Sequence, residues 1–141
     1  MNKLIYILLF TFFISPIYCC GQEIDWKATS NWKLYNIRNK AGFRYPVDSL
    51  AFFKSISLDD SAMKGFLTSA VIWPKEKTSL WMGLFVLSFE TPTKEIRKLV
   101  ISSYGGFFYD PASKRYYELP EIARNAWYLF INDSAATLDS Q

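Results

Sequence analysis

Several short segments of this chain, in which apolar and polar residues alternate or apolar residues run together, predict an antiparallel β-sheet. Trp32–Ile37 alternates and is rich in aromatic and branched residues, as strands are. Leu80–Phe89 is a nearly continuous apolar run, which is typical of a central strand covered on both faces. Thr68–Trp73 also suits a strand, and Glu95–Ser103 suits a strand better than a helix because branched residues fill its centre.

The segment Phe107–Leu119 predicts a β-hairpin, because aromatic residues flank a turn that begins at Asp110 and Pro111. Neighbouring residues of a strand point to opposite faces, so these aromatic residues must appear on both faces of the sheet. One face can belong to the core. The other face is either covered by a helix or exposed as a binding patch. The candidate contact residues of such a patch are Tyr109, Arg115, Tyr116 and Tyr117.

Three helices are predicted around the sheet. Asp48 suits the N-cap of a short helix at Ser49–Ser55. Ser57–Asp60 has the spacing of a capping box at the start of a second helix that ends near Leu67. Pro120 suits the first turn of a C-terminal helix at Glu121–Ile131. The apolar face expected for this last helix consists of Ile122, Ala126, Leu129 and Phe130.

Together these elements predict one α+β domain over residues 31–132. It would contain an antiparallel sheet of about five to six strands, two short inserted helices, and a C-terminal helix packed on one face. Residues 22–30 are mostly polar and are expected to form a linker, within which Trp26 docks onto the domain. Residues 133–141 are small and polar, and a flexible tail is expected there.

The N-terminus has the three parts of a bacterial export signal. Lys3 supplies a positive charge, Leu4–Ile14 is apolar, and Pro16 ends the apolar segment. This apolar segment is shorter than the roughly 20 residues that a membrane-spanning helix needs. Residues 1–21 are therefore predicted to be a signal peptide, and the protein is predicted to be exported.

The sequence IYCCGQ at the end of this leader resembles the lipobox of bacterial lipoproteins. That family pattern places an apolar residue three positions before an invariant cysteine, and Ile17 and Cys20 match it. Tyr18 departs from the pattern, since a small residue is usual there. The resemblance implies a lipid on Cys20 and a membrane-anchored protein. The alternative is ordinary cleavage after Gly21, with the small residue Cys19 before it, which would release a soluble periplasmic protein.

Composition excludes several classes of function. The formal net charge is +3, and charges of both signs are scattered along the chain, without the basic face that nucleic acids require. The chain has no histidine, and its two cysteines are the adjacent Cys19 and Cys20. A histidine-dependent triad and a zinc site built on histidine or cysteine are thereby excluded. Gly105 and Gly106 belong to no phosphate-binding motif. No cofactor and no metal site are expected.

Paired carboxylates can hydrolyse a glycosidic bond without histidine, so the acidic residues keep an enzymatic alternative open. All but Glu118 also have a simpler interpretation, as an acid at the start of a helix or in a turn. The candidates are Asp59, Asp60, Asp110, Glu118 and Glu121.

The chain is rich in aromatic residues, which make up 18% of it. Exposed tyrosine and tryptophan are typical of protein interfaces, and sugars stack on their rings. We therefore expect a small, exported, non-catalytic cell-envelope protein that binds a protein or a glycan through an aromatic-rich sheet face. The alternative is a carboxylate-dependent hydrolase of envelope glycans.

Overall fold

The computed structural model of the chain describes residues 23–37, 44–73, 85–102 and 106–140. The predicted leader, with its processing residues Cys19, Cys20 and Gly21, lies outside the described residues. So does the first part of the predicted Leu80–Phe89 strand.

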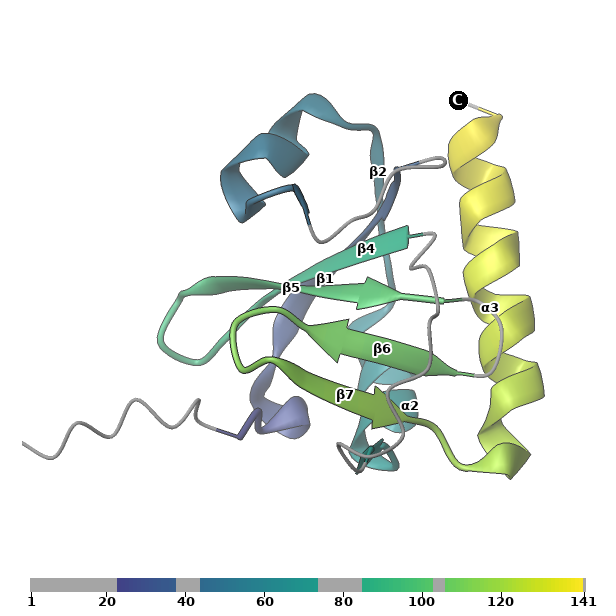
Figure 1. The fold of residues 1–141 in the computed structure, drawn as a ribbon. Helices are drawn as coiled ribbons and strands as arrows, with labels where there is room; N and C mark the ends of the chain where they lie inside the picture. Colours follow the sequence, from purple (N-terminus) through teal and green to yellow (C-terminus); the bar gives the residue numbers. More distant parts are fainter. Residues whose placement is uncertain (1–22, 38–43, 74–84, 103–105, 141) are drawn as a thin grey trace, which may run out of the picture.

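The described residues form an α+β fold, as predicted, with a seven-stranded antiparallel sheet in the order β2-β1-β4-β5-β6-β7-β3 (Figure 1). The helical elements are η1 (Trp26–Ala28), η3 (Val47–Phe52), α2 (Asp60–Thr68) and α3 (Glu121–Asp139), of which η1 and η3 are 3₁₀-helices. The strands are β1 (Ser30–Asn36), β2 (Ser55–Ser57), β3 (Val71–Ile72), β4 (Phe85–Glu90), β5 (Ile96–Ile101), β6 (Phe107–Asp110) and β7 (Arg115–Glu118).

The sheet has more strands than the predicted five to six because it gains the short edge strand β2, and the predicted strand β3 forms the opposite edge. β2 has three residues and was not predicted as a strand. β3 has two residues and is all that pairs within the predicted strand Thr68–Trp73, since α2 continues to Thr68. Segments this short contain no full period of alternation, and only their pairing with β1 and β7 makes them strands.

The register of the ladders assigns each residue to one of two faces, because directly opposite residues share a face. Leu34, Leu87 and Leu99 are opposite one another across β1, β4 and β5, and all are fully buried. Their face, here called the inner face, belongs to the main core, which also contains side chains of α2 and α3. Figure 1 shows α3 extending along the sheet from the β7 end to the β2 end.

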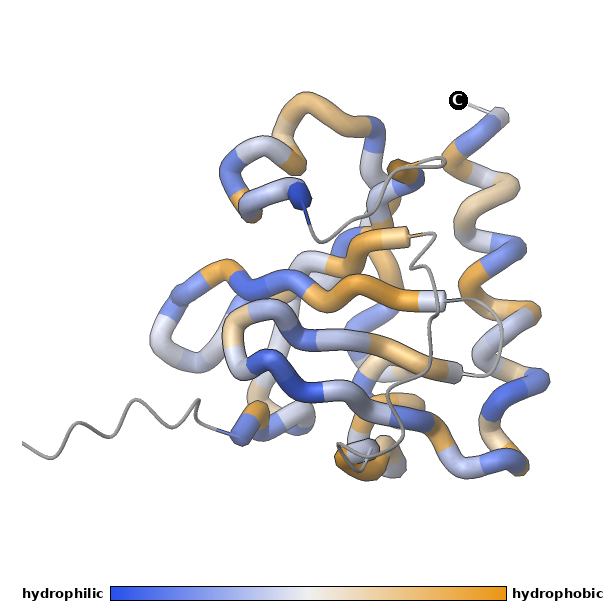
Figure 2. Tube along the Cα trace, viewed as in Figure 1, coloured by the Kyte–Doolittle hydropathy of each residue, from blue (hydrophilic) through white to orange (hydrophobic). Residues whose placement is uncertain are grey.

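The opposite, outer face is apolar at its centre. Val86 and Val100 pair across β4 and β5 and are fully buried. Leu50 of η3 packs with Val86 and Tyr35 in a second, smaller core on this side. Hydrophobic residues accordingly concentrate in β4 and β5, while hydrophilic residues occupy the turns (Figure 2). The central strand is thus covered on both faces, as its apolar run predicted.

The C-terminal helix is longer than predicted. It was expected to end at Ile131, but α3 continues to Asp139 and includes most of the predicted tail. Ala135 and Leu138 are 7% and 2% exposed and belong to the buried face of this helix. Ala135 and Leu138 are separated by about one helical turn, so both reach the core although most of the surrounding residues are polar.

The buried face of α3 also differs from the predicted one. Trp127 and Ile131 are fully buried, whereas Ile122 and Leu129 are 93% and 53% exposed. Trp127 anchors the helix, because its indole Nε1 donates a hydrogen bond of 3.1 Å to the backbone carbonyl of Ser102. A helix with apolar residues on more than one side can be rotated about its axis, and the packing partner selects the rotation.

The predicted linker also contributes to the domain. β1 begins at Ser30, and Ile24 is 8% exposed. The predicted docking of Trp26 is present, with its ring centroid 5.5 Å from that of Tyr117 and 6.0 Å from that of Phe108. This segment therefore covers part of the inner face.

Candidate functional site

The β6–β7 hairpin carries the candidate binding residues, and its turn is held by a buried carboxylate. Asp110 has no exposed surface and forms an ion pair with Arg97 of β5. It also accepts hydrogen bonds from the backbone N–H of Ala112, at 3.0 Å, and from the hydroxyl of Ser113, at 2.6 Å. Lys114 completes the turn with a left-handed φ of 55°. The turn predicted at Asp110 is therefore present and tightly fixed.

Alternation along the hairpin divides the candidate residues between the two faces. Tyr117 is 3% exposed and stacks on Phe108 of the inner face, with ring centroids 5.2 Å apart. Arg115 pairs with Asp110 in the register, so it lies on the inner-face side as well. Burial is the main cause that raises the pKa of Tyr117, which keeps its hydroxyl neutral. Tyr117 and Arg115 therefore do not share a surface with the other two candidates.

Tyr109 and Tyr116 lie together on the outer face. They are directly opposite each other across the hairpin, and their ring centroids are 4.5 Å apart. Phe107 is on the same face, and Trp73 stacks on it with centroids 4.5 Å apart and an interplanar angle of 19°. The rings of Trp73 and Tyr116 also pack edge to face, with their centroids 6.4 Å apart. We call these four partly exposed residues the outer aromatic cluster.

Sequence reasoning had not assigned Trp73 or Phe107 to the site. Trp73 follows β3, and its backbone N–H donates to the carbonyl of Tyr116 at 2.8 Å, which aligns it with the hairpin. The available signal was the strand predicted at Thr68–Trp73, but the partner of that strand was not predicted. Arg124 of α3 lies 5.6 Å from the Phe107 ring and adds a cation–π contact at the border of the cluster.

Burial shifts the pKa values of two titratable groups on the outer face, Lys98 and Tyr109. Lys98 pairs with Ser88 across β4 and β5 and is 9% exposed, and burial lowers its pKa. Burial also raises the pKa of Tyr109, and the neighbouring Tyr116 and Asp110 add to this effect. Tyr109 therefore keeps its phenol proton at neutral pH.

The other end of the outer face, beside η3, contains a groove of about 910 Å³. Tyr35 and Ser88 line its floor, and Leu50 and Phe53 line the side formed by η3 and the residue after it. Its size falls in the range of small-molecule sites. The groove and the outer aromatic cluster therefore occupy opposite ends of one sheet face.

The five carboxylates proposed for hydrolysis have separate places in the structure. Asp59 caps α2, and Asp60 accepts two backbone hydrogen bonds from β1. Asp110 holds the hairpin turn, Glu118 forms an ion pair with an arginine of α3 at 3.5 Å, and Glu121 lies in the first turn of α3. Within the described part of the chain, no three acidic, histidine or cysteine side chains gather as metal ligands would.

Comparison of the chain with protein-family models, with curated proteins and with solved structures finds no match. Among the helices in the described residues, none has both the length and the apolar character needed to cross a membrane.

Proposed function

We propose that this chain is an exported, non-catalytic protein of the bacterial cell envelope that binds another protein through its outer aromatic cluster. It is periplasmic after ordinary cleavage, or membrane-anchored if Cys20 carries a lipid. The cluster itself supports this proposal. Tyr109 of β6 and Trp73, which follows β3, both contact Tyr116 of β7, and all three remain partly exposed. Tryptophan and tyrosine dominate the energetic centres of protein interfaces.

The surroundings of the cluster favour a polypeptide over a glycan. Val71 and Ile72 of the edge strand β3 are 53% and 47% exposed, beside the cluster. Exposed apolar side chains on an edge strand suit an extended peptide that pairs with the edge. In addition, one face of the Trp73 ring is occupied by Phe107, which leaves less of the ring for a sugar to stack on.

A site-specific photo-cross-linker tests the proposal. The full chain is produced in bacterial cells with p-benzoylphenylalanine at Tyr116, and in a matched control at Leu129 on the exposed side of α3. We expect one discrete cross-linked protein from the Tyr116 position and none from the Leu129 position. That protein is then purified, and its dissociation constant is measured with the wild-type chain and with Tyr116→Ala and Leu129→Ala.

The affinity measurement decides the outcome. Truncating a residue at the centre of an interface typically costs about 2 kcal/mol or more, so Tyr116→Ala should weaken binding roughly 30-fold while Leu129→Ala changes little. Unfolding curves of both variants confirm that the fold is kept. Equal affinities for the two variants would contradict the proposal. A cross-linked product that a glycosidase removes would show that the cluster binds a glycan instead.

A further inference from the structure

The groove beside η3 has a floor of hydroxyl groups. The register places Ser55 and Ser57 of β2, Lys33 and Tyr35 of β1, and Ser88 of β4 on the outer face, and all of them line the groove. Ser88 interrupts the apolar run of a central strand, yet it is only 5% exposed. Its hydroxyl donates to that of Tyr35 over 3.4 Å, so the phenol proton of Tyr35 is still available to a ligand.

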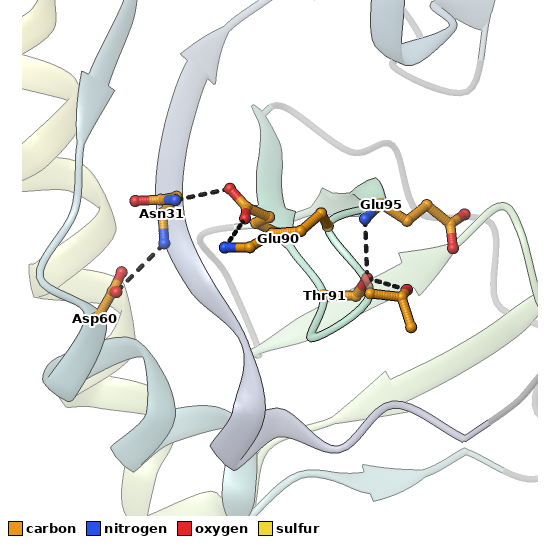
Figure 3. Close-up of polar contacts among 7 residues, drawn as sticks. Asn31, Asp60, Glu90, Thr91 and Glu95 are labelled. Atoms are coloured by element: carbon orange, nitrogen blue, oxygen red, sulfur yellow. Dashed lines mark hydrogen bonds and ion pairs between the residues drawn. The ribbon is translucent and has the colours of Figure 1, made fainter.

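The rim of the groove has an irregular backbone that side-chain hydrogen bonds hold in place. Asn31 is a non-glycine residue with a left-handed φ of 56°, at a point where the register of β1 shifts against β4. Its side-chain amide donates to Glu90 over 2.8 Å, and its backbone N–H donates to Asp60 over 3.3 Å (Figure 3). Lys94 holds the other carboxylate oxygen of Glu90 at 2.6 Å. Strained residues and bulges concentrate beside binding sites.

The charges of the lining restrict the ligand. Among the described residues, one lysine, Lys33, and three acids, Asp48, Asp60 and Glu90, line the groove. This balance disfavours phosphate and carboxylate ligands. The hydroxyl groups of the lining both donate and accept hydrogen bonds, and each carboxylate can accept two hydrogen bonds at once. The lining therefore suits a neutral ligand that carries several hydroxyl groups. Tyr35 and Phe53 add apolar ring surface for the carbon skeleton of such a ligand.

We infer that this groove is a binding site for a neutral saccharide of one or two sugar units, separate from the outer aromatic cluster. Tyr35 and Ser88 provide hydrogen bonds at the floor, Asp48 and Ser55 provide them at the sides, and η3 supplies the apolar wall. The inference does not depend on the proposed protein partner.

NMR titration of the ¹⁵N-labelled protein tests this assignment. The probes are glucose, galactose, N-acetylglucosamine, maltose and cellobiose, with glucuronate and inorganic phosphate as anionic comparisons. We expect at least one neutral sugar to bind with a dissociation constant on the order of 1 mM. The backbone amide signals of Ser57 and Ser88 should shift, because these residues line the groove.

Two conservative substitutions locate the site. Tyr35→Phe together with Ser88→Ala removes two hydroxyl groups that bond to each other, so the fold should be nearly unaffected. Sugar affinity should fall about 10-fold or more. Tyr116→Phe, at the outer aromatic cluster, is the matched control and should leave sugar affinity unchanged.

Three results would overturn the inference. The first is the absence of shifts around the groove with every neutral sugar at concentrations up to about 50 mM, well above a millimolar dissociation constant. The second is equal sugar affinity for the wild-type chain and the Tyr35→Phe/Ser88→Ala variant. The third is tighter binding of glucuronate or phosphate at the groove, which would make it an anion site. None of these results bears on the protein partner, which is tested through Tyr116.

Discussion

Asp110 is a fully buried charge, and its removal tests how the hairpin that carries the outer aromatic cluster is held. Its carboxylate has three partners: the guanidinium of Arg97, the backbone N–H of Ala112 and the hydroxyl of Ser113. Asp110→Ala removes all three interactions at once. It also leaves the side chain of Arg97, which is 12% exposed, without a counter-charge.

The size of the effect follows from these contacts. Breaking a buried ion pair by removing one partner costs about 3–5 kcal/mol, and each lost turn hydrogen bond costs about 1 kcal/mol. Water that reaches the slightly exposed Arg97 offsets part of this cost. We therefore expect Asp110→Ala to lower the free energy of unfolding by about 4 kcal/mol. For a domain of this size, that corresponds to a fall in Tm of roughly 15 °C or more.

Urea denaturation at neutral pH, followed by circular dichroism, measures this change. Asp59→Ala is the matched control, because Asp59 is an exposed N-cap whose carboxylate accepts one backbone hydrogen bond at 2.7 Å. Loss of such a cap costs about 1 kcal/mol. A double-mutant cycle with Arg97→Met isolates the ion pair, and the double variant should lose less stability than the sum of the single variants.

Two results would refute this reasoning. One is a loss for Asp110→Ala no larger than that for Asp59→Ala. The other is that the losses in the free energy of unfolding for Asp110→Ala and Arg97→Met simply add in the double variant, which would show that the two side chains do not stabilise each other.

Three further changes are predicted from single contacts. Trp26→Ala should lower the free energy of unfolding, measured by urea denaturation, by about 2–3 kcal/mol, because the partly buried Trp26 ring contacts three rings of the inner face. An unchanged free energy of unfolding would mean that the segment before β1 does not stabilise the domain. Leu138→Ala should cost about 2 kcal/mol by thermal unfolding, because Leu138 is 2% exposed, whereas a flexible tail would show no change. Hydrogen bonds from Lys94 and Asn31 lower the pKa of Glu90 below 4.5, so its stabilising contribution is present above pH 4.5 and is lost as the pH falls through the lowered pKa. Glu90→Gln should therefore flatten the acid side of a plot of stability against pH, and an unchanged slope would contradict this origin.

Local sequence signals predicted the elements that local chemistry defines. The hairpin at Phe107–Leu119 is confirmed as β6 and β7, because turn residues and alternation act within a few neighbours. The helix predicted to end near Leu67 is confirmed as α2, but its N-cap is Asp59 and not Ser57, where the predicted capping box begins. The short helix predicted at Ser49–Ser55 is present as the 3₁₀-helix η3 at Val47–Phe52.

Elements that depend on distant partners were less predictable. β2 and β3 are strands only because β1 and β7 pair with them. Of the predicted apolar face of α3, Ile122 and Leu129 are exposed while Phe130 packs against the core, because Trp127 anchors the helix in a different rotation.

In the candidate site, too, local sequence determined one part and contacts with distant segments determined another. The sequence by itself determined that aromatic residues occupy both faces of the hairpin, because alternation is a property of any strand. Only the tertiary structure decided which face is which. Docking of Trp26 and α3 buries Tyr117 on the inner face and leaves Tyr109 and Tyr116 on the outer face beside Trp73. Alternation specifies a period of two residues but not its phase, and burial against distant segments selects the phase.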